Sequence, residues 1–399
     1  MRKLSLFLLL FCSLASYGKD NQISFEVSNG IHQDKRGNYA LLLPILPQYI
    51  EANTALTIKS GDRMLSAEFS LINTWPTVAA KEYKLERQFI RLLLVEIAGE
   101  KSLPQALTLS WYALSPVNST KQKLLALSFK TMPSNVALVY PSLSWLSQSV
   151  LLHDIGNVNA DWYLEPQKKY ANYITNSALL NQKGYPETRA SQWLYDRAQA
   201  IYQLYVMTGD SKWQISADQL SLFYQQHIDE TGQFTLKKQF DPKMLMPKGL
   251  LYRFFLSGDF EAKKTLQRMF EKSLDWDESY NSWRGFWTER NQAAALNVAV
   301  SYWELSNEPN ALKRINDIIN ATVEMTFNPG NDWPLRGCPQ HSFKAHEGWG
   351  DNSPTCSPWM MALLGDALWR FYLLSGDKRA ASLIDAFGDF ILIHGIYYG

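Results

Sequence analysis

The sequence has few cysteines, almost no net charge and, after its first residues, no long apolar run. The formal net charge of +1 argues against a nucleic-acid-binding protein, because such proteins usually carry a strong basic excess. No later segment reaches the roughly 18 apolar residues that a membrane-spanning helix needs. We therefore expect no nucleic-acid partner and no stable membrane insertion. The sequence does not indicate an oligomeric state.

Several motifs that announce a cofactor or a metal are also missing. The chain lacks the glycine patterns of dinucleotide and nucleotide phosphate sites, the Gly-x-Ser-x-Gly elbow and the alternating acidic loop that binds calcium. His346 and Glu347 are adjacent, which is not the His-x-x-x-His spacing of a zinc helix. We expect no cofactor and no metal.

Aromatic residues, in contrast, are abundant. The chain holds 14 Trp, 20 Tyr and 19 Phe. Aromatic side chains contribute large packing areas, and tryptophan also offers a flat platform for ligands. Composition alone is consistent with a well-packed aromatic core, and it also makes a carbohydrate ligand plausible.

The first residues have the layout of a secretory signal peptide. Arg2 and Lys3 precede an apolar run over 4–14, and small residues follow over 15–18. This order predicts a signal peptide over 1–18 and an exported protein, periplasmic or secreted. Its removal leaves Cys338 and Cys356 as the remaining cysteines. An even pair in an exported protein predicts a disulfide bond, worth about 3 kcal/mol for a loop of this length.

Two regions differ in their apolar period. Over 19–135, apolar and polar residues alternate and turn signals such as Asn29-Gly30 separate the runs, which predicts an antiparallel β-sandwich or barrel. From 140 to 399 the period is helical. There the turns Thr208-Gly209-Asp210, Ser257-Gly258-Asp259 and Ser306-Asn307-Glu308 recur every 49 residues, and Ser375-Gly376-Asp377 follows 69 residues later.

Each of these turns predicts a hairpin of two helices, because glycine and asparagine end helices in the left-handed conformation. The expected pairs are 188–208 with 211–228, 243–257 with 260–274, 288–306 with 309–325, and 357–375 with 378–396. A repeat of helix hairpins predicts an α/α array, an open solenoid or a toroid. The fold class is thus α+β multidomain, a β-sandwich or barrel followed by an α/α toroid that is complete or incomplete.

The repeat also gives the array two different ends. The turns within hairpins are short, whereas the connectors between hairpins, 229–242, 275–287 and 326–356, are long. All long connectors must lie at one end of the array. Because loops on a rigid scaffold commonly carry function, we expect the site at this long-connector end.

Three segments resemble known proteins. Trp193–Ala198 and Trp287–Ala293, each followed by a Thr-Gly-Asp-like turn, resemble the helices of toroidal polysaccharide lyases. Ala67–Pro76 resembles the β domain that precedes the toroid in exo-rhamnogalacturonan lyase-like proteins. The resemblance spans most of the chain after 18 and implies an exported enzyme that acts on a polysaccharide or oligosaccharide. It implies cleavage of a uronate-containing glycan by β-elimination.

A uronate lyase needs a group that offsets the carboxylate, a base for the C5 proton and an acid for the departing O4. The candidates share side chains suited to these roles and a place at the long-connector end; they are His346, Tyr280, Arg284, Glu289 and Arg290. Each has a plainer explanation as well. Arg284 can pair with a neighbouring acid, and Glu289 suits the first turn of a helix.

Candidate substrate-binding residues come from the same end: Trp283, Trp287, Trp349, His341, Asn291, Tyr195 and Lys238. Two other functions remain open. A glycoside hydrolase would need two carboxylates flanking a cleft, and a non-catalytic carbohydrate-binding or envelope assembly protein would need an aromatic groove without convergent titratable groups. The sugar, the linkage and the endo or exo mode are not specified by the sequence.

Overall fold

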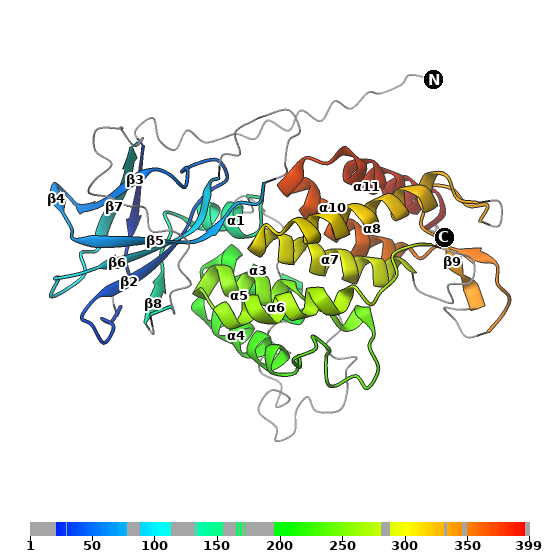
Figure 1. Cartoon of the computed structure of the whole chain (residues 1–399), viewed down its shortest axis with the longest axis horizontal. Helices are drawn as coiled ribbons and strands as arrows, with labels where there is room; N and C mark the ends of the chain where they lie inside the picture. The colour runs from blue at the N-terminus through cyan, green and yellow to red at the C-terminus, as the bar shows by residue number, and fades with distance from the viewer. Residues whose placement is uncertain are drawn as a thin grey trace.

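The computed structural model describes residues 21–28, 30–77, 88–112, 132–133, 135–154, 165–166, 168–169, 172, 195–280, 288–330, 333–344 and 349–395. Strands come first and helices follow, and the two kinds of element gather on opposite sides of the molecule (Figure 1). The α+β fold class predicted from the change of period is confirmed.

The strands form two four-stranded sheets. One sheet has the order β1-β7-β3-β4 and the other the order β5-β6-β2-β8. All neighbours are antiparallel except β8, which runs parallel to β2, so the second sheet is mixed rather than wholly antiparallel. The strands are β1 Gln22–Glu26, β2 Tyr39–Pro44, β3 Ala55–Ser60, β4 Arg63–Met64, β5 Ala67–Thr74, β6 Ile90–Ile97, β7 Ala106–Tyr112 and β8 Val136–Leu138.

The second sheet is covered on both faces. Leu41 and Leu43 of β2 point into the core between the two sheets, whereas Ala40 and Leu42 join the core of the helical region. All six residues of β2 and all eight of β6 are buried. Apolar residues therefore follow one another without alternation in β2 and over 92–95 of β6, as expected for strands buried on both sides. Alternation is clear only in strands such as β1.

The helices form the four predicted hairpins. Left-handed residues end the first helix of each pair, with φ of 70° at Gly209, 70° at Gly258, 58° at Asn307 and 69° at Gly376. The pairs are α3 Arg197–Thr208 with α4 Ser211–Gln226, α5 Lys248–Ser257 with α6 Phe260–Ser273, α7 Thr288–Ser306 with α8 Pro309–Phe327, and α10 Pro358–Ser375 with α11 Lys378–Phe390. A further helix, α1 Leu143–Val150, precedes them.

The first helices of the hairpins lie side by side. Helix α3 packs on α5, α5 on α7 and α7 on α10, while α4, α6, α8 and α11 each pack on their own partner. Closure of these helices into a complete toroid stays a prediction.

The β-sandwich covers the short-turn end of the helices. Asn73 of β5 donates from Nδ2 to the Leu305 carbonyl oxygen at 3.0 Å. Asn307, the residue that ends α7, bonds to Thr77 through its side chain, accepting from the backbone N–H at 3.1 Å. The long-connector end therefore lies on the side of the helices away from the sandwich (Figure 1).

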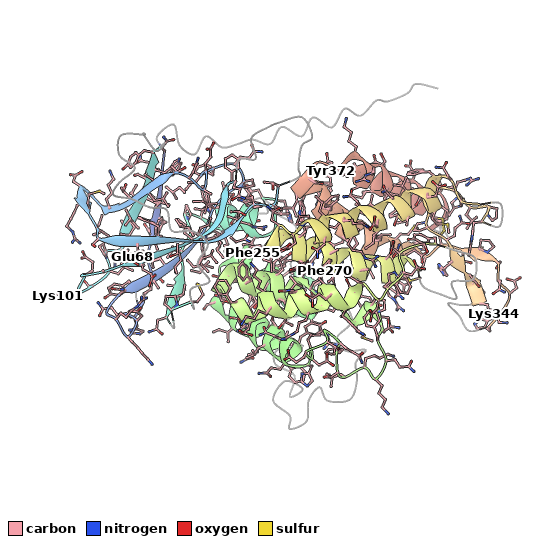
Figure 2. The ribbon with its side chains drawn as sticks, in the orientation of Figure 1. Glu68, Lys101, Phe255, Phe270, Lys344 and Tyr372 are labelled. Atoms are coloured by element: carbon pink, nitrogen blue, oxygen red, sulfur yellow. A yellow bond between two sulfur atoms is a disulfide. The ribbon has the colours of Figure 1, made fainter. Side chains whose placement is uncertain are left out.

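A buried charge cluster joins the two regions. Glu304 of α7 accepts from Arg370 Nε at 2.7 Å and pairs with Arg91 of β6 at 2.5 Å. The Arg91 guanidinium lies between the rings of Trp75 and Phe255, 4.1 and 3.8 Å from their centroids. Figure 2 shows Phe255 where the strands meet the helices. Burial alone would raise the pKa of Glu304, but Arg370 and Arg91 hold it below its usual value.

The long-connector end carries the predicted disulfide bond. Cys338 and Cys356 are joined, which confirms the pairing. Between them, β9 His341–Ser342 pairs with β10 Pro354–Thr355. Lys344 follows β9 and lies at the end of the molecule furthest from the sandwich (Figure 2). In the described ranges no helix is both long and apolar enough to cross a membrane.

Candidate functional site

A pocket opens among the N-terminal halves of α3, α5, α7 and α10, at the long-connector end. It encloses about 220 Å³. Its apolar lining comes from alanine, leucine, methionine and proline side chains. Its polar lining consists of Tyr195, Asp196, Gln199, Gln203, Lys243, Lys248, Arg290, Asn297 and Asp366.

One carboxylate in the wall of this pocket accepts hydrogen bonds from the first turns of two helices. Asp196 is the N-cap of α3 and accepts from the Gln199 backbone N–H at 3.1 Å. The same carboxylate accepts from the Gly249 N–H in the first turn of α5, at 3.0 Å to Oδ2. A Cβ on Gly249 would lie 2.8 Å from that of Ala198 and 2.9 Å from Asp196 Oδ1. Only glycine therefore lets α5 begin this close to Asp196.

The backbone at the pocket edge is strained. Tyr195 and Asp196 are consecutive non-glycine residues with φ of 71° and 47°. Such residues are uncommon in the left-handed region and cluster at functional sites. Burial raises the pKa of Asp196, and the N–H groups of Gly249 and Gln199 together with the charge of Lys248 offset this only in part. A strongly buried carboxylate in a pocket is a frequent mark of function.

The side chains over 289–292, in the first turn of α7, are all polar or charged and yet buried. Glu289 contacts His341 Nδ1 at 2.9 Å and accepts from the Ser357 N–H at 3.0 Å. Gln292 accepts from Trp276 Nε1 at 2.7 Å. Asn291 is fully buried, and within the described ranges neither of its amide atoms has a hydrogen-bond partner. This turn ties α7 to both neighbouring connectors, and it aims Arg290 at the pocket.

Exposed aromatic rings stand at the pocket rim. Tyr195 is 47% exposed and Trp359, in the first turn of α10, is 44% exposed. Their ring centroids are 6.0 Å apart and nearly perpendicular. The Arg290 guanidinium lies 5.9 Å from the Trp359 ring. Exposed rings beside a cation suit a ligand that has both a flat apolar face and a polar edge.

Two lysines line the pocket with different partners. Lys243 pairs with Asp241 at 2.7 Å, and both side chains are largely buried. Lys248, the first residue of α5, is buried and pairs with Asp366 of α10. Asp366 itself is half-exposed. The pocket thus holds cationic, carboxylate and phenolic groups in one space.

The residues singled out from the sequence are spread over this end of the molecule. Tyr195 and Arg290 line the pocket. Glu289, Asn291 and His341 are buried around the same first turn of α7. The others that the structure describes do not line the pocket: they are the partly buried Tyr280, the exposed Lys238 and Trp349. His346, Arg284, Trp283 and Trp287 lie outside the described residues.

The sequence reasoning did not single out Lys248 or Asp366 as site residues. Lys248 follows Pro247 at a helix start, and Asp366 sits eight residues into an apolar helix. The local sequence signals were a proline before the helix for Lys248 and a single acidic residue in an apolar run for Asp366. Neither identifies a pocket, because the contact between Lys248 and Asp366 spans 118 residues of sequence. In the described residues, no group of three or more His, Cys, Asp or Glu could hold a metal ion.

Comparisons with known proteins add little. No family model matches the chain, and no curated protein does. One solved structure named polysaccharide lyase is similar over 92% of this chain and 57% of its own, with a TM-score of 0.32 and 11% sequence identity. This chain thus spans little more than half of that protein. At these values the likeness supports no statement about chemistry.

Proposed function

We propose that the chain is an exported carbohydrate-active enzyme, a lyase that cleaves a uronate-containing glycan by β-elimination. The observation that carries this proposal is the joint presence of the Tyr195 phenol and the Arg290 and Lys248 cations around one pocket. Tyrosine beside a cation is what a uronate lyase needs. The aromatic rim and the resemblance of the helical segments to toroidal lyases support the same function.

The proposed reaction assigns a role to each kind of group. A cation, Arg290 or Lys248, offsets the substrate carboxylate and makes the C5 proton more acidic. With Tyr195 as the phenolate, its oxygen removes that proton and becomes the neutral phenol, the electrons of the C5–H bond form a C4–C5 double bond, and the C4–O4 bond breaks. A proton then passes to the departing O4. Tyr195 can supply this proton because it has just received one.

The volume of the pocket limits the size of the ligand that it can hold. Its volume of about 220 Å³ is below the roughly 300–1,000 Å³ of a site for a drug-sized ligand. We infer that one sugar ring enters and that the adjoining ring lies against Trp359 at the rim. This arrangement keeps the linkage to be broken next to Tyr195.

Ultraviolet absorbance tests the reaction. The full chain is incubated with alginate, glucuronan, pectin fragments, ulvan and glycosaminoglycans, and we expect one of them to give rising absorbance from the new C4–C5 double bond. Tyr195→Phe and Arg290→Gln should each slow this rise by at least about 100-fold. Tyr112→Phe, on an exposed strand residue of the sandwich, is the matched control and should keep the rate.

Three results would contradict the proposal. New reducing ends without new absorbance would favour a glycoside hydrolase. Full activity in Tyr195→Phe with a loss in Tyr280→Phe would move the reaction away from this pocket. No change in either signal, together with binding on a glycan array, would indicate a non-catalytic carbohydrate-binding protein.

The hydrolase is the second candidate because two carboxylates, Asp196 and Asp366, line the pocket. A carboxyl group with a raised pKa, such as Asp196, is what a general acid requires. Against this, the Asp196 oxygens already accept from the N–H groups of two helices. A helix cap that must also approach a glycosidic oxygen would have to give up these bonds, so the lyase is the better-supported function.

A further inference from the structure

Lys248 is a buried cation whose counterion is exposed. Its side chain is 4% exposed and ends at the carboxylate of Asp366, which is 51% exposed. Lysine is almost never buried without a partner, because removing an ammonium group from water costs several kcal/mol. A half-exposed aspartate loses little when it turns back to water. The pair is therefore asymmetric: without Asp366, Lys248 would keep only the helix-capping carboxylate of Asp196 nearby among the described residues, whereas Asp366 does not require Lys248.

The other cations of the pocket differ in this respect. Lys243 and its partner Asp241 are both largely buried, at 19% and 11% exposure, so that pair has little reason to open. Arg290 is held beside the Trp359 ring at the rim. Of the two pocket lysines in the described part of the chain, Lys248 is the one for which exchange of partners costs less.

We propose that Lys248 binds the carboxylate of a hexuronate ring, and that Asp366 holds this position until the sugar arrives. This inference rests on the proposed function and makes it more specific, because it assigns the substrate carboxylate to Lys248 rather than to Arg290. The incoming carboxylate replaces the Asp366 carboxylate on the same ammonium group. One anion leaves and another enters, so no charge is left buried alone.

This exchange sets the specificity of the pocket. A neutral hexose or a uronate methyl ester carries no anion that can displace Asp366, and it gains no charge-assisted hydrogen bond. Such a bond is worth about 1.5–3 kcal/mol, which corresponds to a preference of roughly 10- to 100-fold for the free acid. Asp366 thus acts as a competitor that only an anionic sugar overcomes.

Calorimetric titration of the full chain tests the exchange. The probes are glucuronate and galacturonate, the methyl ester of each, and the neutral sugars glucose and galactose. We expect a uronate to bind at millimolar concentration, at least about tenfold more tightly than its methyl ester. Asp366→Asn removes the competing charge and should tighten uronate binding severalfold without changing the affinity for the ester. Lys248→Met should abolish the preference for the free acid.

The Asp366→Asn arm keeps the test decisive even if Lys248→Met does not fold, because Asp366 is half-exposed. Three results would overturn the proposal: equal affinity of the wild-type chain for acid and ester, weaker uronate binding by Asp366→Asn than by the wild-type chain, or no uronate binding by both. Absorbance is followed on the same samples with uronate polymers. Selective uronate binding without elimination would reject the lyase function and support the carboxylate site at Lys248. Elimination without a preference for the free acid would support the lyase function and reject that site.

Discussion

The two ends of the helical region each bury a carboxylate, and the two carboxylates are treated in opposite ways. At the short-turn end, two guanidinium groups hold Glu304 and its pKa is lowered. At the long-connector end, backbone N–H groups hold Asp196 and its pKa is raised by burial. The first end neutralises its charges internally and joins the sandwich to the helices. The second leaves a buried acid and cations around a pocket, which is typical of a site for chemistry.

The largest effect should come from breaking the charge cluster at the short-turn end. Glu304→Gln keeps the shape of the side chain but leaves Arg91 and Arg370 buried without a counterion. We expect the free energy of unfolding in urea to fall by about 3–5 kcal/mol at neutral pH. Glu261→Gln, an exposed glutamate paired with Lys264, is the control and should change it by less than about 0.5 kcal/mol.

The loss of stability in Glu304→Gln should depend on pH. Since the pKa of Glu304 is lowered from its ordinary 4.5, its ionised form stabilises the fold above pH 4.5, and this contribution disappears as the pH falls through the lowered value. The gap between the wild-type chain and Glu304→Gln should therefore shrink in acid. A gap that is small at neutral pH, or that does not shrink, would show that the cluster does not join the two regions.

At the long-connector end, Asp196→Asn should lower the free energy of unfolding by less than Glu304→Gln does, and with the opposite dependence on pH. Asp196→Asn leaves an amide N–H facing the backbone N–H of Gly249 and should destabilise the chain by about 1–2 kcal/mol. The pKa of Asp196 is raised from its ordinary 3.8. Its contribution is therefore fully present below pH 3.8 and declines as the pH rises through the raised value. The gap to Asp196→Asn should be widest in acid and narrower at neutral pH.

The matched control is Asp210→Asn. Asp210 caps α4 at the short-turn end and accepts from the Lys212 N–H at 3.1 Å. Asparagine caps helices about as well as aspartate, so urea unfolding should move by less than about 0.5 kcal/mol. If both variants behave alike, Asp196 is an ordinary cap, and the contrast between the two ends loses its main support.

How far the sequence predicts the structure differs between these regions. The hairpins were predictable because their turns are local: a left-handed residue after each helix and an acid after it are visible in three consecutive letters. The end of the helices at which the pocket opens was predicted from connector length alone. The burial of β2 and β6 on both faces could not be predicted from alternation, since apolar residues follow one another through β2 and over 92–95 of β6, and the charged Arg91 and Glu96 are buried as well.

The site was less predictable for a physical reason. Tyr195 and Arg290 could be named because they lie at or just before the starts of helices at the long-connector end. Lys248 and Asp366 meet only after α5 and α10 are placed around one space. The same holds for Glu289 and His341, which are 52 residues apart. Contacts of this kind depend on tertiary packing and leave no local pattern.

The smallest expected effect separates two exposed tryptophans at the long-connector end. Trp349 is 65% exposed and contacts Phe343 in the connector, whereas Trp359 stands beside Tyr195 at the pocket. Trp359→Ala should raise the KM for the cleaved glycan by about 2- to 10-fold, as expected for one lost aromatic contact, and Trp359→Phe should restore most of it. Trp349→Ala should leave the KM unchanged. A larger change in Trp349→Ala would place the sugar on the disulfide-closed connector, so that the pocket would no longer be where substrate binds.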